Sequence, residues 1–202
     1  MKTIAIFGAG GHTKVIIDLI QELNQHTIVG IYDDNKEGCF EDIQIIGKID
    51  ENVNIDYDDY IIGIGNDNIR KKIYEQFSNL RWAVLLHPRS IISKNSVIND
   101  GTVVFAGAVI QTGVSIGKQC IINTNCNIDH ESYIENFTSI CPGVTICGNV
   151  TIGELTFIGA NSTIIQGKSI GTNCIIGAGT IVIRNVDDNS KIVGNPGRIM
   201  LK

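Results

Sequence analysis

His130 and Glu131 are the neighbouring side chains best suited to proton transfer in this sequence of 202 residues. His130 is the only histidine beyond residue 88, and Glu131 follows it directly. General-base catalysis needs an imidazole that titrates near neutral pH, and a nearby carboxylate orients the ring and supports its charged form. A solvated His-Glu pair without a catalytic role has the same sequence signature. The pair is therefore a candidate base, and both interpretations stay open.

A glycine-rich segment near the N-terminus is the second candidate site. Gly8-Ala9-Gly10-Gly11-His12 follows an apolar run and precedes a helical pattern, so its amides and the helix dipole can hold a phosphate. Asp33 and Asp34 come about twenty residues later, at the end of the next apolar run, where they can accept hydrogen bonds from a ribose or a base. Thr13 stands where a dinucleotide fingerprint has glycine. A tight turn and a solvated loop remain the alternatives.

The elements around the glycine segment predict a small Rossmann-like α/β domain over residues 1–88. Apolar runs indicate strands at 3–8, 28–34, 60–65 and 81–87. Helical spacing of apolar residues indicates helices at 12–23 and 68–77. Because strands and helices alternate, we expect a parallel sheet.

From residue 89 to residue 202 the sequence has a six-residue period. Every sixth position from Ile92 to Val182 is Ile or Val without a break, sixteen positions in all. A smaller side chain lies two residues before each of these, with Lys168 as the exception, and three cysteines, Cys120, Cys126 and Cys174, are among them. Asn or Gly, which tolerate positive φ, fill eleven of the fifteen positions three residues before the aliphatic one. This pattern predicts a parallel β-helix with three short strands per coil and about five coils.

Four of these corner positions break the Asn/Gly rule, and Glu131 is one of them. The others are Gln119, Phe137 and Leu155. Departures from a local pattern are expected at functional or strained positions. The departure at Glu131 therefore adds weight to the catalytic interpretation of His130.

The motifs together resemble a known family. NTNCNIDHESYIENF, the GAGGH start, IGIGNDNIRKKI and GNPGR are similar to hexapeptide-repeat sugar acetyltransferases, which include bacillosamine-pathway N-acetyltransferases and sialic acid O-acetyltransferases. The resemblance implies a left-handed β-helix in the second domain. It also implies direct transfer of an acetyl group from acetyl-CoA to the 4-amino group of a nucleotide-linked sugar, UDP-linked by this resemblance, in bacterial glycan biosynthesis.

The resemblance also implies roles for individual residues. His130 is the base, Glu131 orients it, Asn123 matches an active-site asparagine, and the Gly148 amide stabilises the oxyanion. The implied sugar-nucleotide site consists of Gly8, Gly10, Gly11, His12, Asp33, Asp34, Gly65 and Asn66. The implied CoA site lies in a groove between neighbouring prisms of a homotrimer and comprises Ser139, Gly159, Ala160, Ala178 and Arg198. Ser139 stands where the family commonly has a further histidine, and Arg198 can equally be a solvated terminal charge.

Composition limits the class of protein. A formal charge of −5 and a sequence pI of about 5.3 argue against a basic nucleic-acid binder. The chain shows no membrane-length apolar run, and its start breaks into glycines too early for a signal peptide, so we expect a cytoplasmic protein without membrane insertion. The six cysteines form no CxxC pair and are expected to be reduced. A zinc-dependent β-helix carbonic anhydrase needs three histidines, so we expect no metal.

Several functions remain to be separated by experiment. The leading one is N-acetylation of a nucleotide-linked amino sugar, and the nearest alternative is O-acetylation of a sialic acid or a related sugar. A nicotinamide dehydrogenase built on the first domain and a non-enzymatic β-helix scaffold are the others. Acetyl transfer that survives removal of His130 would favour the scaffold.

Overall fold

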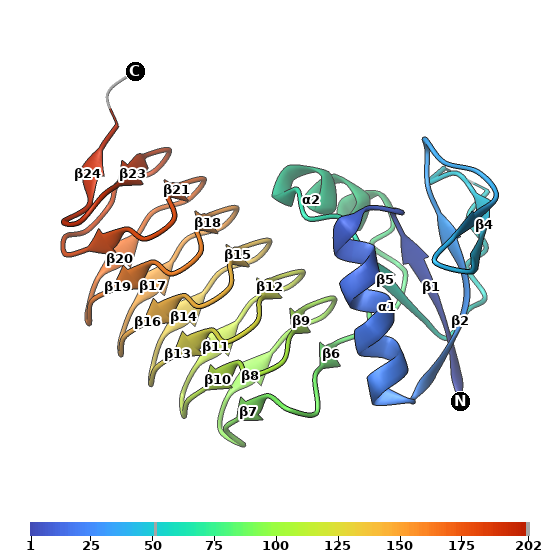
Figure 1. Cartoon of the computed structure of the whole chain (residues 1–202), viewed down its shortest axis with the longest axis horizontal. Coiled ribbons are helices and arrows are strands. Elements are labelled where there is room, and N and C mark those ends of the chain that lie inside the picture. The colour runs from blue at the N-terminus through green and yellow to red at the C-terminus, as the bar shows by residue number, and fades with distance from the viewer. Residues whose placement is uncertain (51, 201–202) are drawn as a thin grey trace.

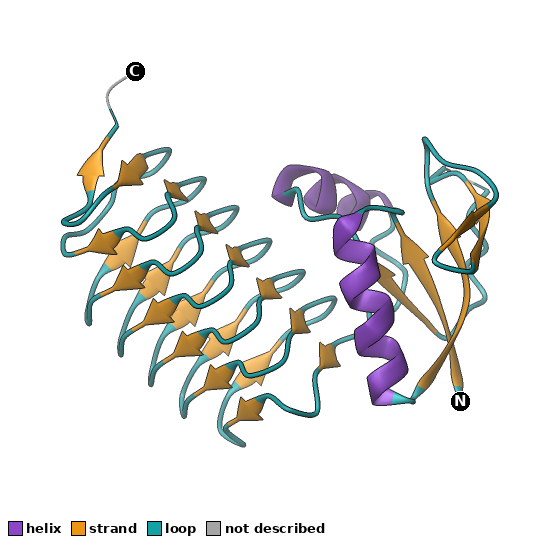
Figure 2. Ribbon diagram, in the orientation of Figure 1, coloured by secondary structure: helices purple, strands orange, loops and turns teal. Residues whose placement is uncertain are grey.

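A computed structural model describes residues 1–50 and 52–200 as an α/β domain followed by a β-helix (Figure 1). Residue 51 in the first predicted domain and residues 201–202 at the end of the second lie outside the described residues. The α/β domain contains the helices α1 and α2, and the long column of short strands belongs to the β-helix (Figure 2). The predicted fold class is confirmed: a parallel sheet with helices precedes a parallel β-solenoid.

The first domain is a five-stranded sheet in the order β3-β4-β2-β1-β5. Its pairs are parallel except for the β3/β4 hairpin, which the sequence pattern did not indicate. Alternate residues of β1 point to opposite faces, so Ile4 and Ile6 pack with α1 while Ala5 and Phe7 pack with Ile73 of α2. The elements are β1 (Lys2–Phe7), α1 (Gly11–Leu23), β2 (His26–Tyr32), β3 (Cys39–Phe40), β4 (Ile43–Gly47), β5 (Asp59–Ile62) and α2 (Asp67–Gln76).

The strand predicted at residues 81–87 is divided between the two domains. Trp82 forms an isolated parallel bridge to Tyr60 in the first domain. Leu85–Leu86 (β6) instead pairs with β9 (Val103–Val104) of the β-helix. Leu85 is fully buried in the same cluster as residues from both domains, so the chain crosses from one domain to the other inside a shared core.

Three sheets form the three faces of the β-helix. The first face contains β7 (Ile91–Ile92), β10 (Val109–Ile110), β13 (Asn127–Ile128), β16 (Thr145–Ile146), β19 (Thr163–Ile164) and β22 (Ile181–Val182). The second contains β8 (Val97–Ile98), β11 (Ser115–Ile116), β14 (Tyr133–Ile134), β17 (Thr151–Ile152) and β20 (Ser169–Ile170). The third contains β6, β9, β12 (Ile121–Ile122), β15 (Ser139–Ile140), β18 (Phe157–Ile158), β21 (Ile175–Ile176), β23 (Lys191–Val193) and β24 (Arg198–Ile199).

The strand register explains the six-residue period. Each strand pairs with the strand eighteen residues later, as Ile110 pairs with Ile128 and Ile128 with Ile146, so identical aliphatic side chains stack inside the prism. The expected five coils undercount the solenoid. β6 before the repeat and β23 after it continue the third face, so this face has more parallel strands than five coils would supply. Seven of its eight strands are parallel, and only β24 is antiparallel.

The prism has three corners, each defined by the strand that precedes it. Residues 129–131 and 147–149 follow the first face and form the first corner; 117–119, 135–137 and 153–155 follow the second face and form the second corner; 123–125, 159–161 and 177–179 follow the third face and form the third corner. Positive φ was predicted at the corners and is found at Asn125, Asn149 and Asn161. The four exceptions to the Asn/Gly rule have the same left-handed conformation, with φ between 54° and 58°.

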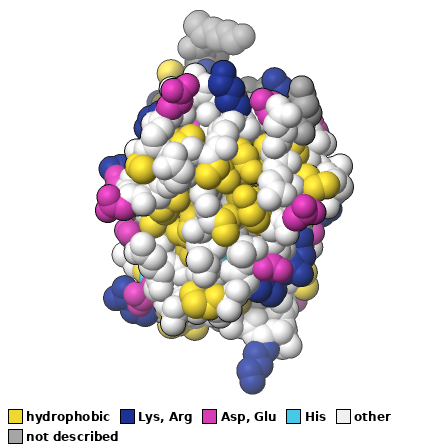
Figure 3. Space-filling view, turned by 90° about the vertical axis from the view of Figure 1, so that its right-hand side faces the viewer, with side chains coloured by type: hydrophobic (Ala, Val, Ile, Leu, Met, Phe, Trp, Pro, Cys, Tyr) yellow, Lys and Arg dark blue, Asp and Glu magenta, His cyan; other side chains and the backbone are white. Residues whose placement is uncertain are grey.

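The first domain packs against the third face. Residues of α1 share a hydrophobic cluster with Val103, Phe105 and Ile121 of the β-helix, and α2 lies beside the second corner. The side of the first domain that points away from the β-helix is seen in Figure 3, where hydrophobic side chains gather near the middle of the face and most charged ones lie toward its rim. The third face is thus covered at its β6 end, and the first corner lies opposite this face across the prism.

A buried ionic cluster at one end of the sheet supplies a stability prediction. Arg81 donates two hydrogen bonds to Asp59, and His26 Nε2 lies 2.9 Å from the same carboxylate. Burial opposes the charged form, but the hydrogen bonds from Arg81 and His26 and the charges of Arg81 and Lys2 outweigh it and lower the pKa of Asp59. A lowered carboxyl pKa stabilises the fold above the unfolded-state value of about 3.9, and this stabilisation is lost as the pH falls through the folded-state pKa.

We therefore expect Asp59→Asn to lower the free energy of unfolding by about 2 kcal/mol at pH 7, because it removes the buried carboxylate that pairs with Arg81 and leaves the buried His26 ring without its anionic partner. The difference from the unchanged protein should shrink as the pH falls below about 4. Urea denaturation at pH 7 and at pH 3.5 measures both values. Asp56→Asn is the control because Asp56 is exposed; equal effects of the two changes at pH 7 would contradict the prediction.

Candidate active site

His130 stands on the first corner, between β13 and β14. Its side chain is about half exposed, at 54%. Nδ1 lies 3.3 Å from Glu131 Oε2, while Nε2 is 4.0 Å from Asp129 Oδ2, beyond hydrogen-bond distance. If Nδ1 carries the proton toward Glu131, Nε2 presents a lone pair to solvent, which is the form that a general base requires. The φ of 57° at Glu131 turns the chain at this point and places its carboxylate beside the ring.

Gly148 lies one coil further along, directly against the His130 ring. The Asn149 amide donates to the His130 carbonyl at 2.8 Å, which holds the two corners together. A Cβ added to Gly148 would stand 2.5 Å from Nε2 and 2.6 Å from Cε1 of the imidazole, so only glycine leaves room for the ring in this position. Among the described residues, no oxygen accepts from the Gly148 amide. The structure therefore brings together an imidazole and a free backbone donor, and acyl transfer needs a base and a donor of these kinds.

Asn123 and Ser139 do not join His130 within this chain. Asn123 lies on the third corner, at the other end of β13, and its Oδ1 accepts from the Thr124 amide at 2.8 Å. Ser139 lies on the third face beneath the first domain and is 4% exposed. Its hydroxyl donates to Asp67 and accepts from Arg70. The predicted CoA contact of Ser139 is not supported, because its proton is already used between the two domains.

The other predicted CoA residues gather on the third corner. Gly159 and Ala160 precede Ala178 by one coil, the Gly179 amide donates to the Ala160 carbonyl at 2.8 Å, and a Cβ on Gly159 would stand 2.6 Å from Ala178 N. Arg198 is exposed on β24, opposite Val193 at the end of the solenoid. These residues therefore form a backbone-lined column with a cation at the end of the prism.

A cavity of about 590 Å³ in the first domain contains most of the predicted sugar-nucleotide residues. It opens where β1, β2 and β5 end, and it is lined by the N-terminus of α1, which favours an anion, and by one side of α2. Asn66 is at its rim, where its side chain caps α2 by accepting from the Ile69 amide. The cavity lining includes Gly8, Gly10, Gly11, His12, Asp33, Asp34 and Gly65.

The two aspartates of this cavity shape its loops. Asp33 accepts from the amides of Ala9, Asn35 and Lys36, and Asp34 accepts from the amide of Ile49. Their predicted role toward a ribose or a base thus competes with backbone hydrogen bonds, which the sequence did not indicate.

The positive charges of the cavity come from lysines, which the sequence analysis missed. Lys36 and Lys72 line it, and Lys72 is exposed. The pair of lysines on the predicted helix at 68–77 was the available signal for Lys72. His12 does not add a charge, because burial and the nearby Arg70 lower its pKa to about 4.

The described helices include none that is long and apolar enough to cross a membrane. Residues 1–50 and 52–200 contain no group of three or more His, Cys, Asp or Glu side chains arranged to hold a metal ion.

Comparison with known families matches both domains. Residues 3–77 match the PglD N-terminal domain, residues 131–166 the bacterial transferase hexapeptide of six repeats, and residues 149–184 the hexapeptide repeat of succinyl-transferase. Among curated relatives, UDP-N-acetylbacillosamine N-acetyltransferase of Bacillus subtilis (strain 168) is 35% identical over 107 residues, which cover 47% of each chain. The matches to curated relatives span only 17% to 47% of those proteins.

Solved structures match the whole chain. The acetyltransferase domain of PglB from Neisseria gonorrhoeae FA1090 has a TM-score of 0.94 at 30% identity and covers 99% of this chain and 100% of its own; the same domain is known in complex with acetyl coenzyme A. A histidine-to-asparagine mutant of perosamine N-acetyltransferase from Caulobacter crescentus, in complex with CoA and GDP-perosamine, has a TM-score of 0.94 at 25% identity and covers 100% of this chain and 98% of its own. With both domains and all motifs accounted for, the chain belongs to the hexapeptide-repeat sugar acetyltransferases.

Proposed function

We propose that this protein transfers the acetyl group of acetyl-CoA to the amino group of a nucleotide-linked amino sugar, with His130 as the general base. The observation that carries the proposal is the His130 ring lying against Gly148, with Glu131 at Nδ1 and Nε2 free of hydrogen-bond partners among the described residues. The cavity of the first domain, which is lined by the glycine turn and by Lys36 and Lys72, supports binding of the nucleotide part of this substrate.

The relatives support an amine as the nucleophile. The B. subtilis relative is named as an N-acetyltransferase of a UDP-linked sugar, and a relative from Aneurinibacillus thermoaerophilus, 48% identical over 42 residues, as a 3-N-acetyltransferase of a dTDP-linked amino sugar. The C. crescentus enzyme holds GDP-perosamine. Our first candidate for the acceptor is a UDP-linked 4-amino sugar, acetylated on nitrogen. The second is a sialic acid, acetylated on oxygen.

The proposed reaction is a single transfer within a ternary complex. The sugar amine attacks the thioester carbonyl while Nε2 of His130 takes a proton from the nitrogen, and Glu131 supports the resulting imidazolium. The carbonyl oxygen becomes an oxyanion and accepts a hydrogen bond from the Gly148 amide. The intermediate collapses by breaking the carbon–sulfur bond, and the imidazolium returns its proton to the leaving CoA thiolate. An amide and free CoA result, and His130 regains its starting form.

The topology favours a site shared between protomers. The first domain packs against the β6 end of the third face, whereas His130 stands on the opposite corner, so the sugar-nucleotide cavity and the base of one chain face different sides of the prism. A homotrimer in which the first corner of one chain meets the first domain of the next would join them. CoA would then lie along a groove between prisms, held by Gly159, Ala160 and Ala178 with Arg198 at its phosphate end. Since acetyl-CoA is made and kept in the bacterial cytoplasm, we place the reaction there.

The acceptor class is tested by supplying acetyl-CoA with a UDP-linked 4-amino-4-deoxy sugar or with a free sialic acid. Products are followed by mass spectrometry, because the exposed Cys39 would interfere with a thiol reagent. We expect saturable acetylation of the UDP-linked amine only. Preferential acetylation of sialic acid would establish the alternative acceptor, and no transfer to either acceptor would contradict the proposed activity.

The nucleotide cavity yields a binding prediction. Lys72→Ala should raise the dissociation constant for UDP roughly tenfold, because one charge-assisted hydrogen bond to phosphate is lost from a partly solvated site. Isothermal titration with UDP measures the change. Lys94→Ala removes an exposed lysine from the β-helix and should leave the constant unchanged; an unaltered constant in the Lys72 variant would show that phosphate binds elsewhere.

A further inference from the structure

We propose that Arg70 is a positioning residue for this reaction: it fixes the sugar-nucleotide cavity to the β-helix coil that carries His130, and so sets where that cavity lies relative to the His130 of the neighbouring protomer in the proposed trimer. The inference rests on the proposed function. It concerns a residue of α2 that is not itself part of the cavity lining and does not lie on the acetyl-transfer corner.

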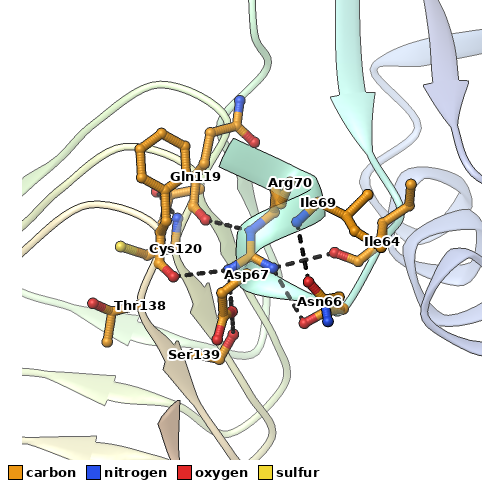
Figure 4. A network of polar contacts seen from close by, with 12 residues as sticks. Ile64, Asn66, Asp67, Ile69, Arg70, Gln119, Cys120, Thr138 and Ser139 are labelled. Carbon is orange, nitrogen blue, oxygen red and sulfur yellow. Dashed lines mark hydrogen bonds and ion pairs between the residues drawn. The ribbon is translucent and has the colours of Figure 1, made fainter. Parts of the chain in front are cut away.

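Arg70 is the most deeply buried charged side chain among the described residues, at 1% exposure. Its guanidinium reaches from α2 to the β-helix, as Figure 4 shows. Nε donates to the Gln119 carbonyl at 2.7 Å, and Nη2 donates to the Phe137 carbonyl and to Ser139 Oγ, each at 3.2 Å. Gln119 and Phe137 are one coil apart, and His130 lies on the segment between them. Arg70 therefore bonds to both ends of the coil that supplies the base.

The same guanidinium holds the rim of the cavity. Nη1 donates to the carbonyls of Ile64 and Gly65, at 3.2 and 3.3 Å, and both residues line the cavity. Nη2 also donates to Asp67 Oδ1 at 2.7 Å, in the first turn of α2. One rigid planar group thus joins the cavity wall to the β-helix, and a lysine cannot reproduce this fork of donors.

The second corner is built to receive α2. Gln119, Phe137 and Leu155, three of the four exceptions to the Asn/Gly rule, are eighteen residues apart and stack on this corner with positive φ. Other contacts accompany Arg70: Lys71 pairs with Glu154 at 2.5 Å, and the ring of Tyr74 packs edge-on against Phe137 at 5.6 Å. Non-glycine residues in the left-handed region cost free energy, so their alignment under one helix indicates a specific docking surface.

Arg70 is not needed for cohesion between the domains, because α1 shares a hydrophobic cluster with Val103, Phe105 and Ile121. Apolar packing is non-directional, whereas a fully bonded guanidinium fixes angle and register. Reacting groups displaced by about 1 Å can lose about 100-fold in rate. The expected consequence of losing Arg70 is therefore a slow reaction between substrates that still bind.

The test compares Arg70→Lys, Arg70→Met and Ser139→Ala with Arg89→Met, which makes the same chemical change at an exposed arginine. Turnover is expressed per CoA-binding site, measured by titration. For Arg70→Lys we expect kcat with the nucleotide-linked amino sugar to fall about 100-fold, with dissociation constants for UDP and acetyl-CoA within threefold of the unchanged protein. The slow acetylation of the same amino sugar without its nucleotide should not change, since that acceptor does not use the cavity.

Turnover of Arg70→Lys within threefold of the unchanged protein would overturn the proposal, as would an equal loss with the nucleotide-free acceptor. If Arg70→Met does not fold, Arg70→Lys and Ser139→Ala decide the result. Failure of the proposed function is distinguishable, because the unchanged protein would then acetylate no nucleotide-linked amine. In that case amide hydrogen exchange still tests the contacts of Arg70. Arg70→Lys should speed exchange across residues 64–76 and leave exchange across residues 157–182 unaltered. Unaltered exchange in both segments would overturn the proposed role of Arg70.

Discussion

Replacing His130 by asparagine should lower kcat for acetyl transfer about 1,000-fold and leave the fold intact. The side chain is half exposed on a corner, so the change removes little buried contact. The loss comes from removing the imidazole that takes the proton of the amine in the proposed reaction, and general-base catalysis contributes about 100- to 10,000-fold in enzymes. Steady-state turnover with saturating acetyl-CoA, together with thermal unfolding, measures the two effects separately.

The matched control for His130 is His87→Asn. His87 precedes the repeat and its Nδ1 accepts from the Arg89 amide, far from the first corner in the strand order. It should retain full turnover. Turnover of the His130 variant within tenfold of the unchanged protein would contradict the assignment of His130 as the base. It would not affect the description of the fold or of the nucleotide cavity.

Replacing Gly148 by alanine should lower turnover about 100-fold with a small effect on stability. The new Cβ would meet the His130 ring at 2.5 Å, and the ring must move because the backbone beneath it is held by the coil. The displaced atoms belong to the far end of a rotatable side chain, so the fold accommodates them, but the base leaves its position beside the Gly148 amide. A misplacement of this size typically costs about 100-fold in rate.

Gly167→Ala is the control for Gly148→Ala, because Gly167 is another glycine of the first corner. It tests whether an alanine at any glycine of this corner lowers turnover. No atom lies within 4 Å of the Cβ that would be added at Gly167, although its φ of 65° disfavours alanine. It should therefore reduce stability more than turnover, the reverse of Gly148→Ala. Thermal unfolding and kcat for both variants, measured together, check this reversal; the same pattern in both would show that the His130 ring does not depend on Gly148.

Much of the candidate site was predictable because it lies within short segments. His130 and Glu131 are neighbours in sequence, and the glycine turn, its helix and Asp33 belong to one βαβ unit whose geometry is well known. Gly148 was assigned by resemblance, and the eighteen-residue coil explains it: the residue one coil beyond His130 must lie beside it. Lys36 and Lys72 were missed, because exposed lysines are too common in sequences to be singled out.

Ser139 shows a tertiary contact that its role by resemblance did not indicate. The resemblance implied a contact with CoA, but Ser139 lies beneath the first domain, is 4% exposed, and bonds through its hydroxyl to Asp67 and Arg70. Asp67 and Ser139 are seventy-two residues apart, so no local pattern connects them. The strand predicted at 81–87 was split for a similar reason, because Leu85 packs into a core shared by both domains.

The sequence by itself determined the β-helix, the α/β domain and the identity of the candidate base, because a six-residue period and a strand-turn-helix motif are local and every repeat obeys the same packing rule. Only the tertiary structure decided which corner of the prism packs against α2. The three remaining irregular corner residues looked equivalent to Glu131 in the pattern, and only the docking of α2 showed that they receive a neighbouring helix. Arg70 could not be found at all from sequence, since most of its partners are backbone carbonyls, which every residue type supplies and which only the folded chain brings to one place.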